Sequence, residues 1–153
     1  MRALRIFLGA VTLVLGLTWL LLNLTLDGFV RDLIVGVVLA AAGLVLLMPH
    51  RVALPLVPTA VITTVVTLVG MAAGLLAVRS QLSGMWAFNT WRGWPYEWLN
   101  KGASAEMSDA AQDLAAKASW EVPDFLHVLG DLYFWAMAGL LVAAVINKRR
   151  FRT

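Results

Sequence analysis

Residues 6–26 read IFLGAVTLVLGLTWLLLNLTL, an apolar run without a charged side chain. At 1.5 Å of rise per residue, a helix of roughly 20 residues spans the ~30 Å hydrocarbon core of a bilayer. Arg2 and Arg5 precede the run, as they would in a secretory signal peptide. The run is longer than the ~7–15-residue core of a signal peptide, however, and no small-x-small cleavage site precedes Asp27. We therefore expect a retained transmembrane helix.

Three further apolar runs follow along the chain, at residues 33–48, 56–78 and 125–146. The second run ends at Pro49, and Asp124 precedes the fourth run as a helix N-cap. The four runs predict an all-α fold, a four-transmembrane-helix bundle that forms a single membrane domain over residues 1–153. In this prediction residues 79–124 form an extracytoplasmic loop, and residues 147–153 form a basic tail.

The composition is typical of a membrane protein. Hydrophobic residues make up 61% of the chain and charged residues 14%, whereas an average soluble domain has about 25% charged residues. The chain has no cysteine, which excludes disulfides, thiolate metal sites and cysteine nucleophiles. The net charge is +3, but the basic residues lie beside the apolar runs, where they would meet anionic lipid headgroups. We therefore expect membrane lipids around the chain and no nucleic acid as a partner.

The basic residues also predict the orientation of the chain. Four spans put both termini and the linker after Pro49 on one side of the membrane. That side holds Arg2, Arg5, Arg51, Lys148, Arg149, Arg150 and Arg152. The other five basic residues are spread mostly over the long loop, and because long loops cross a membrane largely regardless of charge, the short segments decide the orientation. We expect cytoplasmic N- and C-termini and a position in the inner membrane of a bacterium.

Small residues recur at helical spacing in all four runs, and such residues let membrane helices approach closely. The third run contains a GxxxG pattern, Gly70-Met71-Ala72-Ala73-Gly74. The helix-packing residues selected on this basis are Gly36, Gly43, Gly70, Gly74 and Gly139. Such seams would hold the four helices of one chain together, and the alternative is a homo-oligomer formed through Gly70 and Gly74.

Residues 85–99, MWAFNTWRGWPYEWL, hold four of the seven tryptophans. Side chains of this kind favour the membrane–water boundary. We expect a short interfacial helix at residues 83–91, a turn at Gly93 and Pro95, and an amphipathic helix at residues 104–119, so that the Trp-rich loop is partly helical. The candidate partner-binding residues are Trp86, Trp91, Arg92, Trp94, Tyr96 and Trp98.

Three interpretations of this aromatic segment are open. The first is an interfacial belt that has no specific partner. The second is a docking surface for another protein, because tryptophan, tyrosine and arginine dominate the hot spots of protein interfaces. The third is a cap over a lipid or a quinone-like ligand.

Asp124, His127 and Asp131 are spaced three and four residues apart, which puts them on one face at the start of the fourth helix. Because ionisable residues are costly inside a membrane, these three are candidates for proton or ion handling. The alternative is a helix cap with an internal hydrogen bond. One imidazole and two carboxylates are too few for a metal site, and His50 is expected across the membrane from His127, so we predict neither a metal nor a haem.

The sequence has none of the common catalytic or phosphate-binding motifs, and we expect neither an enzyme nor a bound cofactor. The leading hypothesis is a non-catalytic accessory or structural subunit of a larger membrane protein complex, of an energy-transducing, respiratory or envelope type. It would dock on other integral membrane subunits through its helix seams and its aromatic loop. The alternative is a small oligomeric transporter, or a protein that binds a lipid or quinone-type ligand, which uses Asp131 and His127. A third interpretation is a membrane enzyme that acts on lipid through the loop carboxylates.

Overall fold

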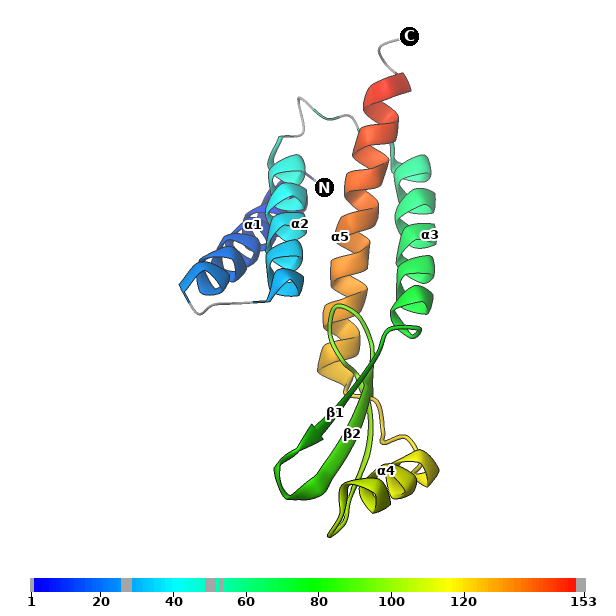
Figure 1. Ribbon diagram of the computed structural model, residues 1–153. Coiled ribbons are helices and arrows are strands. Elements are labelled where there is room, and N and C mark those ends of the chain that lie inside the picture. Colours follow the sequence, from blue (N-terminus) through cyan, green and yellow to red (C-terminus); the bar gives the residue numbers. More distant parts are fainter. Residues whose placement is uncertain (1, 26–28, 49–51, 53, 151–153) are drawn as a thin grey trace. The chain divides into compact units, whose positions relative to one another are not determined.

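The computed structural model of the chain describes residues 2–25, 29–48, 52 and 54–150 (Figure 1). Its long helices are α1 (Arg2–Thr25), α2 (Val30–Leu47), α3 (Leu56–Gly74) and α5 (Phe125–Arg150). All four are long and apolar enough to cross a membrane. The chain is therefore a multi-pass membrane protein, as its apolar runs predict.

The helix ends differ from the predicted ones by a few residues. α3 ends at Gly74 rather than at residue 78, because a turn at residues 75–77 leads from it into strand β1 (Val78–Ser83). α5 continues to Arg150, past the predicted end at residue 146. The predicted turn at residues 27 and 28, the linker residues 49–51 and 53, and tail residues 151–153 lie outside the described part of the chain.

Between α3 and α5 the chain forms an antiparallel sheet and a short helix. The sheet has the strand order β1-β2-β3, with β2 at Ala87–Arg92 and β3 at Leu99–Ser104, and α4 follows at Ser108–Lys117. The predicted all-α fold therefore needs a correction, since the loop contains three strands. The helix predicted at residues 104–119 is present as α4.

The interfacial helix predicted at residues 83–91 is wrong. A 3-10 turn, η1 (Gly84–Trp86), and the strand β2 occupy these residues instead. Aromatic and β-branched side chains such as Phe88 and Thr90 suit a pleated strand, and β2 pairs on both sides, with β1 and with β3. The hydrogen-bond partners of β2 come from other segments of the chain, so that the strand depends on tertiary pairing.

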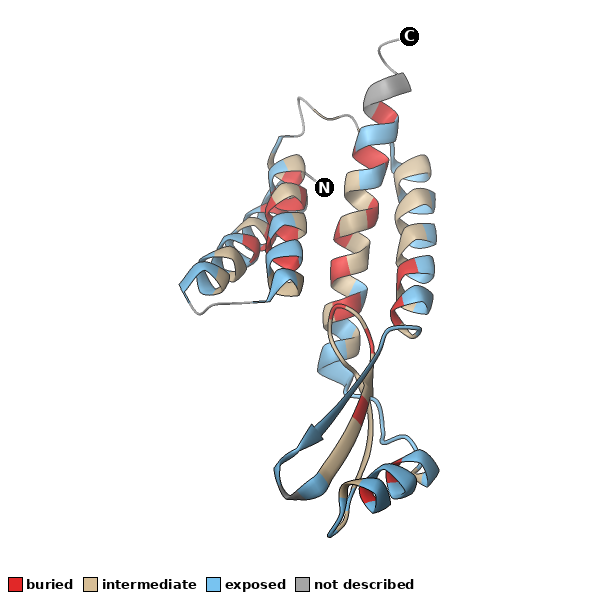
Figure 2. Cartoon of the chain, in the orientation of Figure 1, coloured by how far each residue is buried: buried red, intermediate tan, exposed pale blue. Residues whose placement is uncertain are grey.

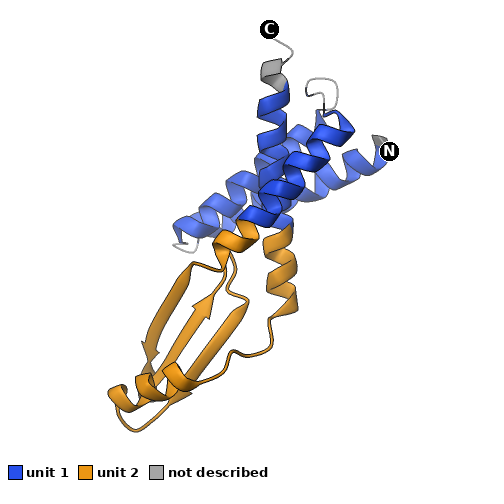
Figure 3. Ribbon diagram, turned by 90° about the vertical axis from the view of Figure 1, so that its right-hand side faces the viewer, with its two compact units in different colours: residues 1–69, 133–153 blue, residues 70–132 orange. Residues whose placement is uncertain are grey.

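The chain divides into two compact units (Figure 3). Unit 1 comprises residues 1–69 and 133–153, which include α1, α2, most of α3 and most of α5. Unit 2 comprises residues 70–132, which include the sheet, α4, the last turn of α3 and the first turns of α5.

In unit 1, α1 and α2 form a helical hairpin with a seam of small residues. A Cβ atom on Gly43 of α2 would lie 2.5 Å from the backbone nitrogen of Leu13 in α1, and one on Gly36 would lie 2.8 Å from Cγ of Leu20. On the α1 side, Gly16 lies against the backbone of Ala40. Backbones this close leave no room for a larger side chain, which is the packing mode of membrane helices rich in glycine.

Arg5 closes one end of this hairpin. Its Nε donates to the carbonyl oxygen of Leu46 at 3.1 Å, and its Nη2 donates to that of Val45 at 3.2 Å. The last carbonyls of a helix lack partners within the helix and carry the negative end of its dipole. A guanidinium from the start of α1 therefore satisfies and neutralises the end of α2.

Other close contacts in unit 1 join α5 to its neighbours. The hydroxyl groups of Thr12 and Tyr133 are 2.5 Å apart and share a hydrogen bond. A Cβ atom on Gly139 of α5 would lie 2.8 Å from Cα of Thr63 in α3. Much of the outer surface of the long helices is exposed and apolar, including Leu17, Val30, Leu68 and Val142 (Figure 2). Such a surface suits lipid rather than water.

Candidate protein-docking surface

The antiparallel register sorts the side chains of the sheet onto two faces. Phe88, Thr90 and Arg92 alternate along β2 on one face. Trp91 lies on the other face, together with its cross-strand partner Asn100. The aromatic residues of β2 therefore do not form one continuous aromatic surface.

Helix α4 covers the face that holds Thr90. Lys101, the cross-strand partner of Thr90, donates its Nζ to the carbonyl oxygen of Ala116 in α4 at 3.4 Å. Ala111 and Ala115 of α4 are 0% and 1% exposed, and Thr90 is 8% exposed. The two alanines allow α4 to lie close to the strands, so that they form the small core of unit 2.

Trp120, which follows α4, holds two cations of the sheet. The guanidinium carbon of Arg92 lies 4.9 Å from the centroid of its ring, and Nζ of Lys101 lies 5.2 Å from it. Both contacts are cation–π interactions. Arg92, a predicted partner-binding residue, is thus engaged within unit 2. Trp120 lies outside the aromatic segment at residues 85–99, and its contact with these two cations depends on the tertiary structure.

Residues 93–97 connect β2 to β3 in a tight loop. The N–H of Trp98 closes the loop by donating to the carbonyl of the last residue of β2 at 3.0 Å. Gly93 has a φ of 128°, a left-handed conformation that favours glycine, and the Trp94-Pro95 peptide bond is cis. The turn predicted here is present.

Two glycines allow this loop to lie against the ends of α3 and α5. A Cβ atom on Gly74 would lie 2.9 Å from the carbonyl oxygen of Trp94. One on Gly130 would lie 3.1 Å from Cδ2 of Tyr96, whose ring centroid is 6.1 Å from that of His127. Trp94 and Tyr96 therefore join the hairpin to the two helices within unit 2.

Asp131 holds the same loop with a hydrogen bond. Its Oδ1 accepts the backbone N–H of Tyr96 at 2.7 Å, and the residue is only 1% exposed. The next loop residue, Glu97, pairs with Arg79 of β1 at 3.2 Å. This hydrogen bond attaches α5 to the hairpin.

Asp124 caps the first turn of α5. Its Oδ1 accepts the backbone N–H groups of Leu126 at 3.0 Å and His127 at 3.3 Å, and its Oδ2 lies 2.8 Å from Nδ1 of His127. The N–H of His127, above all, lowers the pKa of the Asp124 carboxyl below its ordinary value of 3.8. A lowered carboxyl pKa means that the cap stabilises the fold above pH 3.8 and that this contribution is lost as the pH falls through the lowered pKa.

The fold divides the three predicted proton or ion residues into one pair and one separate residue. Asp124 and His127 pair with each other, and both side chains are about half exposed. Asp131 is buried and bonds to the hairpin loop. Within residues 2–25, 29–48, 52 and 54–150, no group of three or more His, Asp or Glu residues is placed to hold a metal ion.

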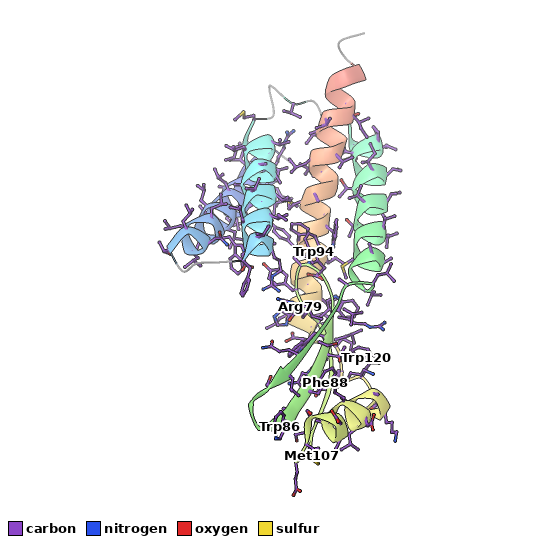
Figure 4. All side chains as sticks on the ribbon, viewed as in Figure 1. Arg79, Trp86, Phe88, Trp94, Met107 and Trp120 are labelled. Atoms are coloured by element: carbon purple, nitrogen blue, oxygen red, sulfur yellow. The ribbon has the colours of Figure 1, made fainter. Side chains whose placement is uncertain are left out.

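The end of the sheet opposite the 93–97 loop carries exposed apolar side chains. Trp86, in the β1–β2 turn, is 48% exposed, and Met107 is 68% exposed. The N–H of Ala105 donates to the carbonyl oxygen of Trp86 at 3.3 Å, which brings the end of β3 beside this turn (Figure 4). The exposed carboxylates of Glu106 and Asp109 flank Met107 in the sequence. We call Trp86, Glu106, Met107 and Asp109 the tip.

The chain matches no protein family, no curated protein and no solved structure.

Proposed function

We propose that this protein is a non-catalytic accessory subunit of a membrane protein complex, in which the four helices lie in the membrane and unit 2 binds another protein of the assembly. The observation that carries the proposal is the exposed tryptophan at the tip, Trp86. Tryptophan is among the residue types most enriched in interface hot spots, and Trp86 shares its end of the sheet with the exposed Met107.

The contacts within unit 2 support this proposal. Trp94, Tyr96 and Asp131 attach one end of the sheet to α3 and α5, and Arg92 lies against Trp120. These groups have roles in folding, whereas the opposite end of the sheet has exposed apolar side chains. A domain that is attached at one end and carries an exposed aromatic residue at the other is suited to presenting that residue to a partner.

The basic residues support an orientation for this subunit. We place both termini in the cytoplasm of a bacterium and unit 2 on the outer side of its inner membrane, because the short basic segments gather at the termini. The partner of unit 2 is then an outer segment of another integral membrane subunit.

Native-size analysis of the full-length protein tests the proposal. The protein is crosslinked in intact membranes, extracted in mild detergent and separated on a native gel, with its companions identified by mass spectrometry. We expect a particle well above the 16.7 kDa of the chain, with the same companions at constant ratio in several detergents. A monomer in every detergent, even after crosslinking in the membrane, would contradict the proposal.

A further inference from the structure

The tip and the 93–97 loop lie at opposite ends of the sheet in unit 2. β1 begins after α3 and has six residues, which extend over about 20 Å at ~3.3 Å per residue. The tip lies at the far end of this strand, whereas the 93–97 loop lies at the near end, against α3 and α5. Within unit 2, the tip therefore lies at the end of the sheet away from α3 and α5.

The backbone at Trp86 holds a large side chain in an unusual conformation. Its φ is 54°, in the left-handed region, which bulky residues rarely adopt and glycine adopts freely. The turn alone would therefore accept glycine more readily than tryptophan. Strained residues of this kind concentrate at binding sites, where the side chain has a use other than folding.

The charge around the tip selects the partner. Glu106 and Asp109 lie one and two positions from Met107 in the sequence. No basic residue lies between Arg92 and Met107 apart from Lys101, which bonds to α4 and lies over Trp120. Unit 2 as a whole has seven acidic and four basic residues between positions 70 and 132. Complementary charge on a partner would steer it to the tip, and like charge would repel it.

The same charges exclude two other occupants. An anionic lipid surface would be repelled by the carboxylates at the tip. A second copy of the chain would present an equally acidic unit 2. Three of its four basic residues are engaged, Arg79 with Glu97 and both Arg92 and Lys101 with Trp120, which leaves Lys117 at the end of α4.

We infer that the tip binds a basic surface of another protein. On that surface an apolar pocket would accept Trp86 and Met107, and lysine or arginine side chains would surround the pocket. This inference rests on the proposed function and names the chemistry of the partner. Trp86 is the anchor, since an aromatic side chain that becomes fully desolvated carries much of the energy of an interface. Glu106 supplies attraction to the basic rim.

Photocrosslinking in native membranes tests the inference with the full-length chain. Benzoylphenylalanine replaces Met107, so that Trp86 is retained, and in a second variant it replaces Val122, which is 91% exposed and lies beyond α4. We expect a protein adduct from position 107 that maps to a partner surface containing lysine or arginine. The yield from position 122 should be several-fold lower.

Three substitutions then separate docking from folding. Trp86→Gly relieves the left-handed backbone, so the thermal midpoint should stay the same or rise while the adduct falls ~10-fold or more. Glu106→Lys should lower the adduct several-fold and make it less sensitive to salt. Asp113→Lys makes the same change in net charge as Glu106→Lys, but on the exposed face of α4. It should leave the adduct yield within about twofold of that of the unsubstituted chain.

The outcomes distinguish this inference from the proposed function. An adduct with lipid or with a second copy overturns the inference, and so does a yield that Trp86→Gly and Glu106→Lys leave unchanged. If position 107 gives no adduct while the protein still migrates in a large complex, the tip is not the docking site but the accessory role stands. A protein that migrates alone overturns both.

Discussion

The carboxylate of Asp131 has the most clearly defined role of any single residue in unit 2. It is buried in the first turns of α5 and accepts the N–H of Tyr96, which lies 35 positions earlier in the sequence. A buried carboxylate is costly unless hydrogen bonds offset the loss of water, and this backbone donor provides one. The contact gives Asp131 a role in folding that needs no proton movement.

Substitutions at Asp131 test this role. Asp131→Ala removes the acceptor of the Tyr96 N–H, which should lower the stability of unit 2 by about 1–3 kcal/mol. Asp131→Asn keeps an oxygen at the same position and should cost clearly less. Hydrogen exchange of the Tyr96 amide and thermal unfolding measure both effects.

The two variants also separate structure from transport. If Asp131→Asn left the exchange of the Tyr96 amide unchanged but abolished movement of protons or solute in proteoliposomes, Asp131 would have a role in transport in addition to its structural one. If the Tyr96 amide exchanged equally slowly in the Asp131→Ala and Asp131→Asn variants, the hydrogen bond to Tyr96 would not hold the loop.

At the scale of elements, glycine sets where helices and loops can meet. The α1–α2 hairpin depends on Gly16, Gly36 and Gly43. Because these residues have no side chain, the backbones of the two helices can approach closely there. Leucine against leucine gains nothing in lipid, so close packing of this kind is the main source of association between membrane helices. Gly74 and Gly130 have the same effect for the 93–97 loop in unit 2.

Enlarging one seam glycine should open the hairpin. Gly43→Leu would bring side-chain atoms into the backbone of Leu13, from which even a Cβ would be only 2.5 Å away. We expect a loss of stability of about 1–3 kcal/mol or more, because an overpacked interface must shift its backbones apart. Ala10→Leu is the matched control, since Ala10 is exposed on α1.

Disulfide trapping measures this effect, because the chain has no cysteine of its own. A cysteine pair introduced across the seam should oxidise readily in the wild-type background and in Ala10→Leu, but several-fold more slowly in Gly43→Leu. Equal rates in all three backgrounds would show that the seam tolerates bulk and that the close approach of α1 and α2 is unimportant.

At the scale of the whole molecule, the chain combines a membrane unit with a small folded unit of different composition. Unit 1 contains eight basic and two acidic residues, and unit 2 contains four basic and seven acidic residues. This asymmetry agrees with the positive-inside rule, which concerns lysine and arginine in short segments. The proposed position of unit 2 outside the cytoplasm is based on the short basic segments at the termini and in the linker.

Single-cysteine labelling tests that orientation. Ser104→Cys, which is exposed at the end of β3, should react with a membrane-impermeant maleimide added to intact cells. Thr153→Cys at the end of the sequence should react only after the membrane is permeabilised. The reverse pattern would place unit 2 in the cytoplasm and remove the partner that we propose for it.

Sequence alone determined the four membrane helices, the helix α4 and the cap at Asp124, because each depends on neighbouring residues. A long apolar run must bond its own backbone in lipid, so its helical state follows from its length and composition. A side chain that caps a helix bonds to amides two and three positions away.

Tertiary structure decided the sheet and the role of each aromatic residue. β2 obtains its hydrogen bonds from β1 and β3, and no local pattern in residues 83–91 distinguishes such a strand from an interfacial helix. Trp94 contacts Gly74, Arg92 contacts Trp120, and only Trp86 of the predicted aromatic set lies at the exposed tip. Those contacts join residues that lie far apart in the chain, and their roles therefore depend on a register that no single segment contains.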